Sequence, residues 1–216
     1  MFVIVVSWNR PKFLRRTLDS LFWFTSSHDK VCVVDNGSHE DTQRVVNSDS
    51  RLHERYVLPK NLGINGALEH VMQASPIFLT EKYILVSDAD MLYNRPLSHA
   101  ERFLEANGSN TNRQFDVLSL HDSPEHKKRG SFRFLDDIYL EKRAERGCSL
   151  VFRRELLERL RPLPVHKMTD FDWWVFRDSP AHINKVAVMP MGSLHLGWRT
   201  EDSTWNPLSV DEYVKL

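Results

Sequence analysis

The sequence YILVSDADM, residues 83–91, joins a run of apolar residues directly to two carboxylates. Its β-branched residues Ile84 and Val86 favour a strand that is buried on both faces of a sheet. Side chains two positions apart share a face in an extended chain, so we expect Asp88 and Asp90 to point the same way. Paired carboxylates of this kind suit Mg²⁺ or Mn²⁺, although an aspartate after a strand also commonly begins a turn. The stretch therefore predicts a cation site or a plain turn at a sheet edge.

The bulk composition is typical of a globular protein. The chain has 216 residues, of which 41% are hydrophobic and 27% are charged, and its formal net charge is +0. This balance provides no overall field that would attract nucleic acid or anionic lipid. The two cysteines, Cys32 and Cys148, lie in apolar runs and are expected to be reduced core residues. Because no segment has the length of a transmembrane helix or the features of a signal peptide, we expect a cytoplasmic protein.

Strands and helices are predicted to alternate in the first part of the chain. The expected strands cover residues 2–7, 31–34, 56–58 and 83–88, with a helix between successive strands. This order and the short connections predict an α/β fold with a mostly parallel, Rossmann-like central sheet and helices on both faces. Ligands of such sheets bind at the carboxyl ends of the strands, where this chain places polar residues and glycine.

The second part of the chain has a less regular pattern. Strands are expected at 115–120, 148–152 and 186–188, and helices at 98–106, 154–160 and from about residue 170 onward. Residues 121–146 carry many charges without a clear period, so we expect a long, partly mobile surface segment there. His195 is expected on a polar loop beyond the last strand.

Seven short motifs resemble, in their order along the chain, those of the family 2 glycosyltransferases of the GT-A fold. They are VVSWNRP (5–11), VVDNGS (33–38), NLG (61–63), SDAD (87–90), GCS (147–149), DFD (170–172) and HLG (195–197). The resemblance covers residues 2 to about 200 and implies a single GT-A domain over 1–216. Within it, 1–95 would be the nucleotide-sugar-binding half, 96–200 the acceptor and catalytic half, and 201–216 a C-terminal tail.

The resemblance further implies a metal-dependent, inverting enzyme that transfers a sugar from a nucleoside-diphosphate sugar to an acceptor hydroxyl. Asn9 and the carboxylate of Asp35 would contact the base or ribose, and an acceptor such as Asp35 favours uridine and hence a UDP-sugar. Gly63 would allow the backbone to approach the ligand. In the DXD motif, Asp88 would approach the ribose or the metal, and Asp90 would be the firmer ligand of Mn²⁺ or Mg²⁺. Asp35 as a turn residue and Gly63 as a helix-entry glycine remain alternatives.

On the resemblance, the remaining donor-side residues come from the end of the chain. His195 would complete the metal shell, and Trp198 and Arg199 would close over the diphosphate. The metal would stabilise the charge that develops on the leaving diphosphate. Asp170 would be the base that takes the proton of the acceptor hydroxyl. The family usually has Glu-Asp where this chain has Thr169-Asp170, a departure that removes one carboxylate and keeps the expected base.

The acceptor side is less specific. Asp172 would orient the base or bind the acceptor, while Trp173 and Trp174 would stack on a sugar or would be ordinary core aromatics of a helix. Arg129 belongs to a basic stretch, 126–133, that would hold a phosphorylated acceptor or nucleic acid, or would be a solvated surface. The acceptor is expected to be a saccharide, a lipid-linked group or, as for some phage enzymes in the host cytoplasm, a modified DNA base.

Two other functions are compatible with a sheet that carries metal-binding carboxylates. A nucleotidyltransferase usually has a glycine-rich loop with Lys or Arg after its first strand, whereas residues 7–11 contain no glycine. A non-catalytic nucleotide-sugar-binding module would not need both Asp170 and His195. Both alternatives are therefore less favoured than a glycosyltransferase.

Overall fold

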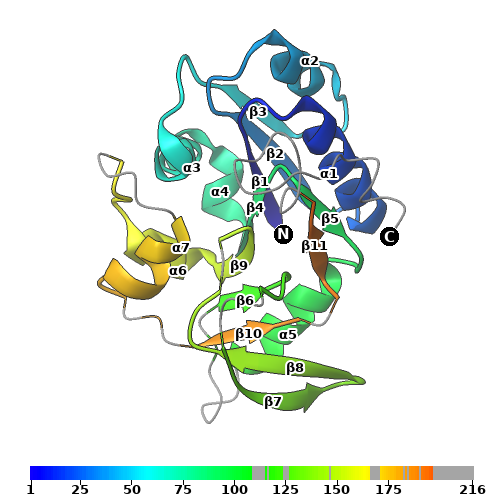
Figure 1. Cartoon of the computed structure of the whole chain (residues 1–216), viewed down its shortest axis with the longest axis vertical. Helices are drawn as coiled ribbons and strands as arrows, with labels where there is room; N and C mark the ends of the chain where they lie inside the picture. Colours follow the sequence, from blue (N-terminus) through cyan, green and yellow to red (C-terminus); the bar gives the residue numbers. More distant parts are fainter. Residues whose placement is uncertain are drawn as a thin grey trace.

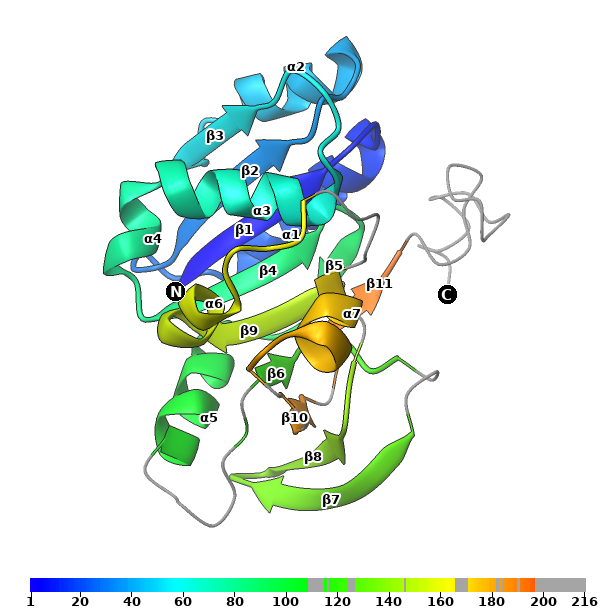
Figure 2. The ribbon, with the colours of Figure 1, turned by 90° about the vertical axis from the view of Figure 1, so that its left-hand side faces the viewer.

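The structure is a computed structural model in which the helices lie on both faces of one large sheet (Figures 1 and 2). The described residues are 1–108, 115, 117–123, 127–145, 147–165, 171–181, 183, 185–189 and 191–196. Nine strands form the large sheet and two further strands form a small one. The α/β class that the sequence predicts is therefore confirmed.

Four parallel strands form the first half of the large sheet. They are β1 (Phe2–Ser7), β2 (Lys30–Asp35), β3 (Glu54–Val57) and β4 (Tyr83–Asp88), in the spatial order β3-β2-β1-β4. Their parallel pairing places Ser7 opposite Asp35, and Val6 opposite Asp88. The carboxyl ends of these strands thus lie together at one edge of the sheet. This is the edge at which the sequence predicts ligand binding.

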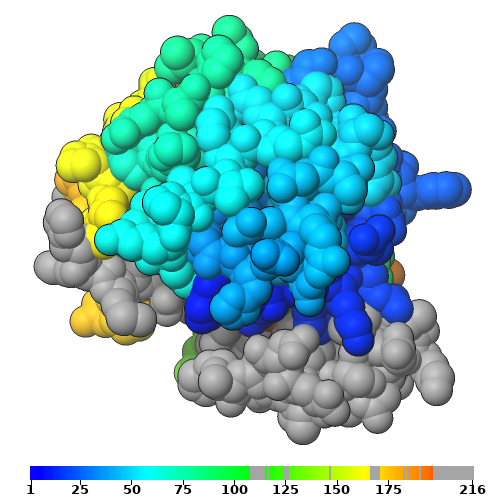
Figure 3. All heavy atoms as spheres, turned by 90° about the horizontal axis from the view of Figure 1, so that it is seen from above, coloured from blue at the N-terminus to red at the C-terminus, as the bar shows by residue number. Residues whose placement is uncertain are grey.

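One helix follows each of β1, β2 and β3, as the sequence predicts, and a further short helix precedes β4. They are α1 (Pro11–Phe24), α2 (Glu40–Ser48), α3 (Gly63–Ala74) and the short α4 (Pro76–Thr80). Pro11 opens α1, because a proline at the first helical position has no hydrogen bond to lose. In the view from above, the segment from α2 to α3, blue to cyan, forms the middle of the visible surface (Figure 3).

The second half of the chain extends the same sheet. Its strands are β5 (Met91–Tyr93), β6 (Val117–Ser119), β7 (Lys128–Phe134), β8 (Asp137–Lys142), β9 (Ser149–Arg153), β10 (Val186–Val188) and β11 (Ser193–His195). Its helices are α5 (Ser98–Gly108), α6 (Arg154–Leu160), the short α7 (Phe171–Trp173) and the π-helix η1 (Trp174–Asp178). The sheet continues from β4 in the order β9-β6-β10-β8-β7.

Strand β9 makes the sheet mixed, because it lies antiparallel between β4 and β6. Strand β10 is parallel to β6, β8 is antiparallel to β10, and β7 is antiparallel to β8. Of the nine described strands, only β8 and β9 therefore run against the direction of β1. The insertion of β9 brings the start of that strand, and with it Cys148, beside the end of β4.

The partly mobile surface segment predicted at residues 121–146 contains regular structure that was not predicted, because β7 and β8 form a hairpin at the edge of the sheet. The aromatic side chains hold it there: Phe132 and Phe134 pack on the core, and Tyr139 is buried. The Tyr139 ring stacks on Phe103 of α5 with centroids 4.7 Å apart. The charged residues between these aromatics point outward, which masks the alternating pattern of a half-buried strand.

The prediction of a loop at His195 is wrong, because His195 ends β11. This strand pairs antiparallel with β5, and His195 lies opposite Met91. The short segment has little strand signal of its own, and its pairing partner directly follows the DXD motif in the sequence.

Both faces of the sheet are covered by apolar side chains. In β1, Val3 and Val5 belong to a core with the leucines of α1, whereas Phe2 and Ile4 belong to a core with Leu68 and its neighbours in α3. This alternation follows from the two-residue period of a strand, and each such buried side chain contributes about 1.5–3 kcal/mol. Among the helices that the structure describes, none has both the length and the apolar character needed to cross a membrane.

Candidate active site

A cavity of about 460 Å³ opens at the carboxyl ends of β1 and β4. Its volume lies within the range that is usual for small-molecule sites. The lining residues come from the ends of β1, β2 and β4, the loop before α3, the start of β9 and the start of α7: Val6, Trp8, Arg10, Asn36, Asn61, Gly63, Ile64, Asp88, Ala89, Gly147, Cys148, Phe171 and Asp172. Segments that lie far apart in the sequence thus meet around one space.

The loop after β1 forms one side of the cavity. Asn9 has a φ of 53° and connects this loop to the one after β2, because its amide N–H donates to Ser38 Oγ (2.9 Å) and its Oδ1 accepts from the His39 amide (2.8 Å). These bonds turn the flanking residues Trp8 and Arg10 toward the cavity. Asn9 thus holds the loops after β1 and β2 together through hydrogen bonds, and its contact with a nucleotide stays a prediction.

Asp35 lies at the end of β2 and is completely buried. Its Oδ2 accepts from the Ser38 amide (3.3 Å), whereas no described group forms a hydrogen bond with its Oδ1. Burial raises the pKa of Asp35, and the hydrogen bonds from Ser38 oppose that rise. An unsatisfied buried acceptor is costly, so this oxygen is suited to a ligand N–H or O–H.

Asn36 shapes the loop before α3. Its Nδ2 donates to Asn61 Oδ1 (3.0 Å) and to the carbonyl of Gly63 (3.1 Å), and its Oδ1 accepts from the Leu62 amide (2.9 Å). Gly63 lines the cavity with a φ of 71°, and a Cβ at this position would meet no atom within 4 Å. The glycine is thus needed for its backbone conformation, and open space lies over it.

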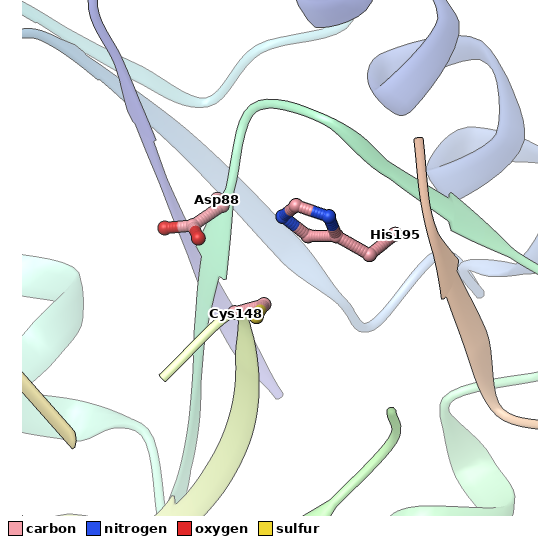
Figure 4. Close-up of side chains that lie close together, drawn as sticks. All are labelled: Asp88, Cys148 and His195. Atoms are coloured by element: carbon pink, nitrogen blue, oxygen red, sulfur yellow. The ribbon is translucent and has the colours of Figure 1, made fainter. Parts of the chain in front are cut away.

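Three potential metal ligands meet beside this cavity (Figure 4): Asp88 and Cys148 line it, whereas His195 is not among its lining residues. One ligand atom each from Asp88, Cys148 and His195 lies within 4.8 Å of the other two. The His195 ring is directed toward Asp88, and Cys148 lies beside both (Figure 4). Bonds from a cation such as Zn²⁺ to these ligand types are about 2.0–2.3 Å long, so two ligands of one ion lie at most about 4.6 Å apart, close to the 4.8 Å within which these three atoms lie. The structure therefore brings together two of the predicted metal ligands, Asp88 and His195.

Asp90 has different surroundings from Asp88. Strand β4 ends at Asp88, and Asp90 lies in the turn that follows, so the extended geometry that the sequence predicts for the pair does not occur. The Asp90 side chain is buried, forms a short ion pair with Arg10, and has its Oδ1 3.3 Å from His195 Nε2. The hydroxyl of Thr17 holds the turn by donating to the Ala89 carbonyl and accepting from the Met91 amide. Metal ligation by Asp90 itself stays a prediction.

A second histidine lies close to the cluster. The ring of His121 is 5.9 Å from that of His195, between centroids. Burial, together with the neighbouring His195, lowers the pKa of His121 to about 4. His121 is therefore neutral at pH 7 and adds no positive charge beside a cation.

The start of α7 forms the opposite side of the cavity. Phe171 is buried against Phe152 of β9, with ring centroids 5.8 Å apart, and this packing leaves Asp172 at the cavity. Trp173 is 51% exposed and lies under the guanidinium of Arg177. Trp174 instead packs on the core and donates its indole N–H to the Leu160 carbonyl (3.2 Å). Of the two tryptophans, Trp173 is thus the one with a free face.

The other predicted site residues lie elsewhere. Arg129 is exposed on the edge strand β7, four strands from β9, and is not part of the cavity lining. Asp170, Trp198 and Arg199 lie outside the described residues.

Sequence reasoning did not single out Arg10, Asn36 and Cys148 as site residues. All three lie inside motifs that it quoted, next to Asn9, Asp35 and the Gly147-Ser149 turn. Their position within these motifs was the available signal. Their residue types alone could not show that they line the cavity.

The family model for glycosyl transferase family 2 matches residues 2–161, most of the chain. The chain belongs to glycosyl transferase family 2. The resemblance drawn from the seven motifs is therefore confirmed. A search of the curated proteins found no match.

Solved structures confirm the GT-A fold of this family 2 chain. TarS from S. aureus is 19% identical, with a TM-score of 0.62 over 87% of this chain. The mannosyltransferase PcManGT from Pyrobaculum calidifontis, in complex with GDP-Man and Mn²⁺, is 18% identical, with a TM-score of 0.57 over 87% of this chain. GalNAc-T7, with UDP, GalNAc and Mn²⁺, is 13% identical, with a TM-score of 0.62 over 99% of this chain. The alignments span 34%, 55% and 46% of those three chains, respectively.

Proposed function

We propose that this chain is a glycosyltransferase that uses a divalent cation to bind a nucleoside-diphosphate sugar in the 460 Å³ cavity and transfers the sugar with inversion. The observation that carries the proposal is the meeting of Asp88 and Cys148, which line this cavity, with His195 beside them, in a family 2 chain. Two structural neighbours, the mannosyltransferase and GalNAc-T7, hold Mn²⁺ together with a nucleotide or nucleotide sugar.

Asp88, Cys148 and His195 fit the cation, because their ligand atoms lie close enough together to share one ion. When bound, the cation neutralises the charge that develops on the leaving diphosphate. Arg10 lies at the same cavity and adds a guanidinium that can form charge-assisted hydrogen bonds with phosphate oxygens. Asp90 orients Arg10 through their ion pair, and its Oδ1 lies 3.3 Å from His195 Nε2 without forming a hydrogen bond.

The nucleotide is placed on the β1–β2 side of the cavity. Asn36 lines the cavity, whereas Asp35, fully buried next to it, does not. One oxygen of Asp35 has no hydrogen-bond partner among the described residues and would suit the imide N–H of uracil or a ribose hydroxyl. In the adjoining loop, Asn36 donates a hydrogen bond to the Gly63 carbonyl, and the space over Gly63 is open. These features favour a UDP-sugar as the donor.

The acceptor is placed on the α7 side. Asp170, the proposed base, directly precedes α7, whose next carboxylate, Asp172, lines the cavity. The base takes the proton of the acceptor hydroxyl as the oxygen attacks the anomeric carbon from the side opposite the leaving group. The exposed face of Trp173 suits stacking on an acceptor sugar, so we favour a saccharide acceptor, free or lipid-linked, over DNA.

A thermal-shift panel of UDP- and GDP-sugars with and without Mn²⁺ tests donor binding. At a hundred times its Kd, a donor stabilises the folded state by about 2.7 kcal/mol, which raises the Tm by roughly 5–10 °C. We expect this rise only when both the UDP-sugar and the cation are present, and we expect Asp88→Asn to abolish it. Asp19→Asn, an exposed carboxylate of α1 that pairs with Arg51, is the matched control and should keep it. A full shift in Asp88→Asn would contradict the donor site.

Transfer is tested separately with Asp170→Asn. This variant should bind the UDP-sugar and Mn²⁺ like the unmodified protein, while glycosylation of candidate acceptors, followed by mass spectrometry, should fall by at least about a hundredfold. Transfer at the normal rate would show that Asp170 is not the base. An α-configured product from an α-linked donor would overturn the inverting mechanism.

A further inference from the structure

A sulfur atom lies among the oxygen and nitrogen ligands of the cation site. Cys148 is 5% exposed, lines the cavity, and has a ligand atom within 4.8 Å of those of Asp88 and His195. Cys32, the other cysteine, is fully buried in β2, on the core face that packs on α3. Neither cysteine forms a disulfide within the described residues, and of the two Cys148 is the one close to the other ligands.

Backbone pairing fixes all three ligands in place. Asp88 and Cys148 are neighbours across β4 and β9, because the Asp88 amide donates to the Cys148 carbonyl (2.9 Å) just beyond the Ser87–Ser149 pair. His195 is held opposite Met91 by the β5–β11 pair, and the Leu196 amide donates to the Asp90 carbonyl (2.6 Å). The thiol therefore lies beside the carboxylate and the imidazole as a consequence of strand pairing.

The ligand set determines which cations bind well. Mg²⁺ prefers carboxylate, water and phosphate oxygens, whereas thiolates and imidazoles favour Zn²⁺ and other later first-row ions. Three protein ligands that leave a further coordination position open are also the usual arrangement of a catalytic zinc site. With one carboxylate, one imidazole and one thiolate, the affinities for Mg²⁺ and Zn²⁺ should therefore differ more than they would at a site made only of oxygen ligands.

We propose that Cys148 is a direct sulfur ligand of the donor-site cation, so that the site binds Zn²⁺ and Co²⁺ more tightly than Mn²⁺, and Mg²⁺ least. On binding, the thiol releases its proton to solvent and the sulfur shares an electron pair with the ion, without any change in oxidation state. The proposal rests on the proposed function, since it concerns the cation of the same site. It implies that zinc competes with the cation that supports donor binding.

The test is a titration of the full chain with Co²⁺, followed by absorption spectroscopy. A thiolate bound to Co²⁺ gives a charge-transfer band in the near ultraviolet, which oxygen and nitrogen ligands do not give. We expect this band to saturate at one ion per chain, to vanish on addition of equimolar Zn²⁺, and to persist in excess Mg²⁺. Cys148→Ser should lack the band, while Cys32→Ala, the matched control, should keep it.

Affinity measurements extend the same test. In Cys148→Ser the affinity for Zn²⁺ should fall by at least about tenfold, while the affinity for Mn²⁺ changes by less than about threefold. If Cys148→Ser does not fold, X-ray absorption of the zinc-loaded unmodified protein decides, because a sulfur ligand appears at about 2.3 Å from the ion.

The outcomes separate this proposal from the proposed function. If Co²⁺ or Zn²⁺ binds without a sulfur signal while the nucleotide sugar still binds with Mn²⁺, sulfur ligation is overturned and the transferase proposal stands. If the unmodified protein binds none of these cations, both proposals are overturned. A band that survives in Cys148→Ser and vanishes in Cys32→Ala would also overturn the assignment.

Discussion

At the scale of single residues, the two aspartates of the DXD motif differ in the charge that surrounds them. Asp88 lines the cavity beside Cys148 and His195, whereas Asp90 is buried and forms an ion pair with Arg10. A buried carboxylate needs a paired cation, because desolvation otherwise outweighs the benefit of its charge. Arg10 supplies that pair from the loop after β1, so the motif is electrostatically tied to a segment eighty residues earlier.

The pairing predicts an asymmetry between two variants in the absence of divalent cations. Arg10→Met leaves the Asp90 carboxylate buried without its guanidinium and should lower the free energy of unfolding by about 2–4 kcal/mol. Asp90→Asn removes the buried charge and leaves Arg10, which is partly exposed, so the loss should be about 1 kcal/mol. Urea unfolding in the presence of a chelator measures both. Equal losses would mean that the Asp90 charge does not depend on Arg10.

At the scale of elements, two short strands decide where the ligands are. Strand β9 carries Cys148 to the end of β4, and β11 carries His195 to the residue that follows the DXD motif. Gly192 allows β11 to approach, because a Cβ there would lie 2.7 Å from the carbonyl oxygen of Leu120. The Ser193 amide donates to that same carbonyl (2.6 Å). His195 is thus positioned by the close contact of two backbone segments.

Gly192→Ala tests this positioning. The added methyl must push β11 away from Leu120, so we expect a loss of about 1–3 kcal/mol in stability together with a weaker affinity for Zn²⁺ or Mn²⁺. Gly130→Ala in β7 is the matched control, because a Cβ there would meet no atom within 4 Å, and both quantities should stay unchanged. Chemical denaturation and cation titration give the two readouts. Normal cation affinity in a folded Gly192→Ala protein would show that β11 need not be fixed in this position.

At the scale of the whole molecule, Glu69 links the two halves of the chain. It lies in α3, in the first half of the chain, and accepts from Arg161 Nη2 (2.7 Å) and from the Leu163 amide (3.3 Å), both after α6. Burial would raise the pKa of Glu69, but the hydrogen bonds from Arg161, Leu163 and Gln73 outweigh it, so the pKa is lowered. The carboxylate form therefore stabilises the folded chain.

This depressed pKa predicts a pH-dependent effect of Glu69→Gln. The stabilisation by Glu69 is fully present above the ordinary glutamate pKa of about 4.5 and is lost as the pH falls through the lower folded pKa. We expect Glu69→Gln to be about 1–3 kcal/mol less stable at pH 6–8 and to approach the unmodified protein below pH 4. Denaturation curves across this range measure the difference. A difference that stays constant down to pH 3 would contradict the role of the charge.

Much of the fold could be predicted from local signals. The strands and helices predicted before residue 89 correspond to β1–β4 and α1–α3. Their apolar residues recur with a regular period, and residues such as Pro11 and Gly37 mark their boundaries. The β7–β8 hairpin was missed, since its exposed face is so charged that the alternation of Phe132, Phe134 and Tyr139 is hidden. Strands β5 and β11 were missed because three residues carry no period.

By itself, the sequence determined the order of β1–β4 with α1–α3 between them, the family, and the placement of Asp88 at the end of a buried strand, because these depend on patterns within a few residues. The tertiary structure alone decided which side chains meet. Cys148 joined Asp88 because β9 pairs antiparallel with β4, and His195 joined them because β11 pairs with β5. Such pairings are fixed by the packing of the whole sheet and its backbone hydrogen bonds, so no local pattern encodes them.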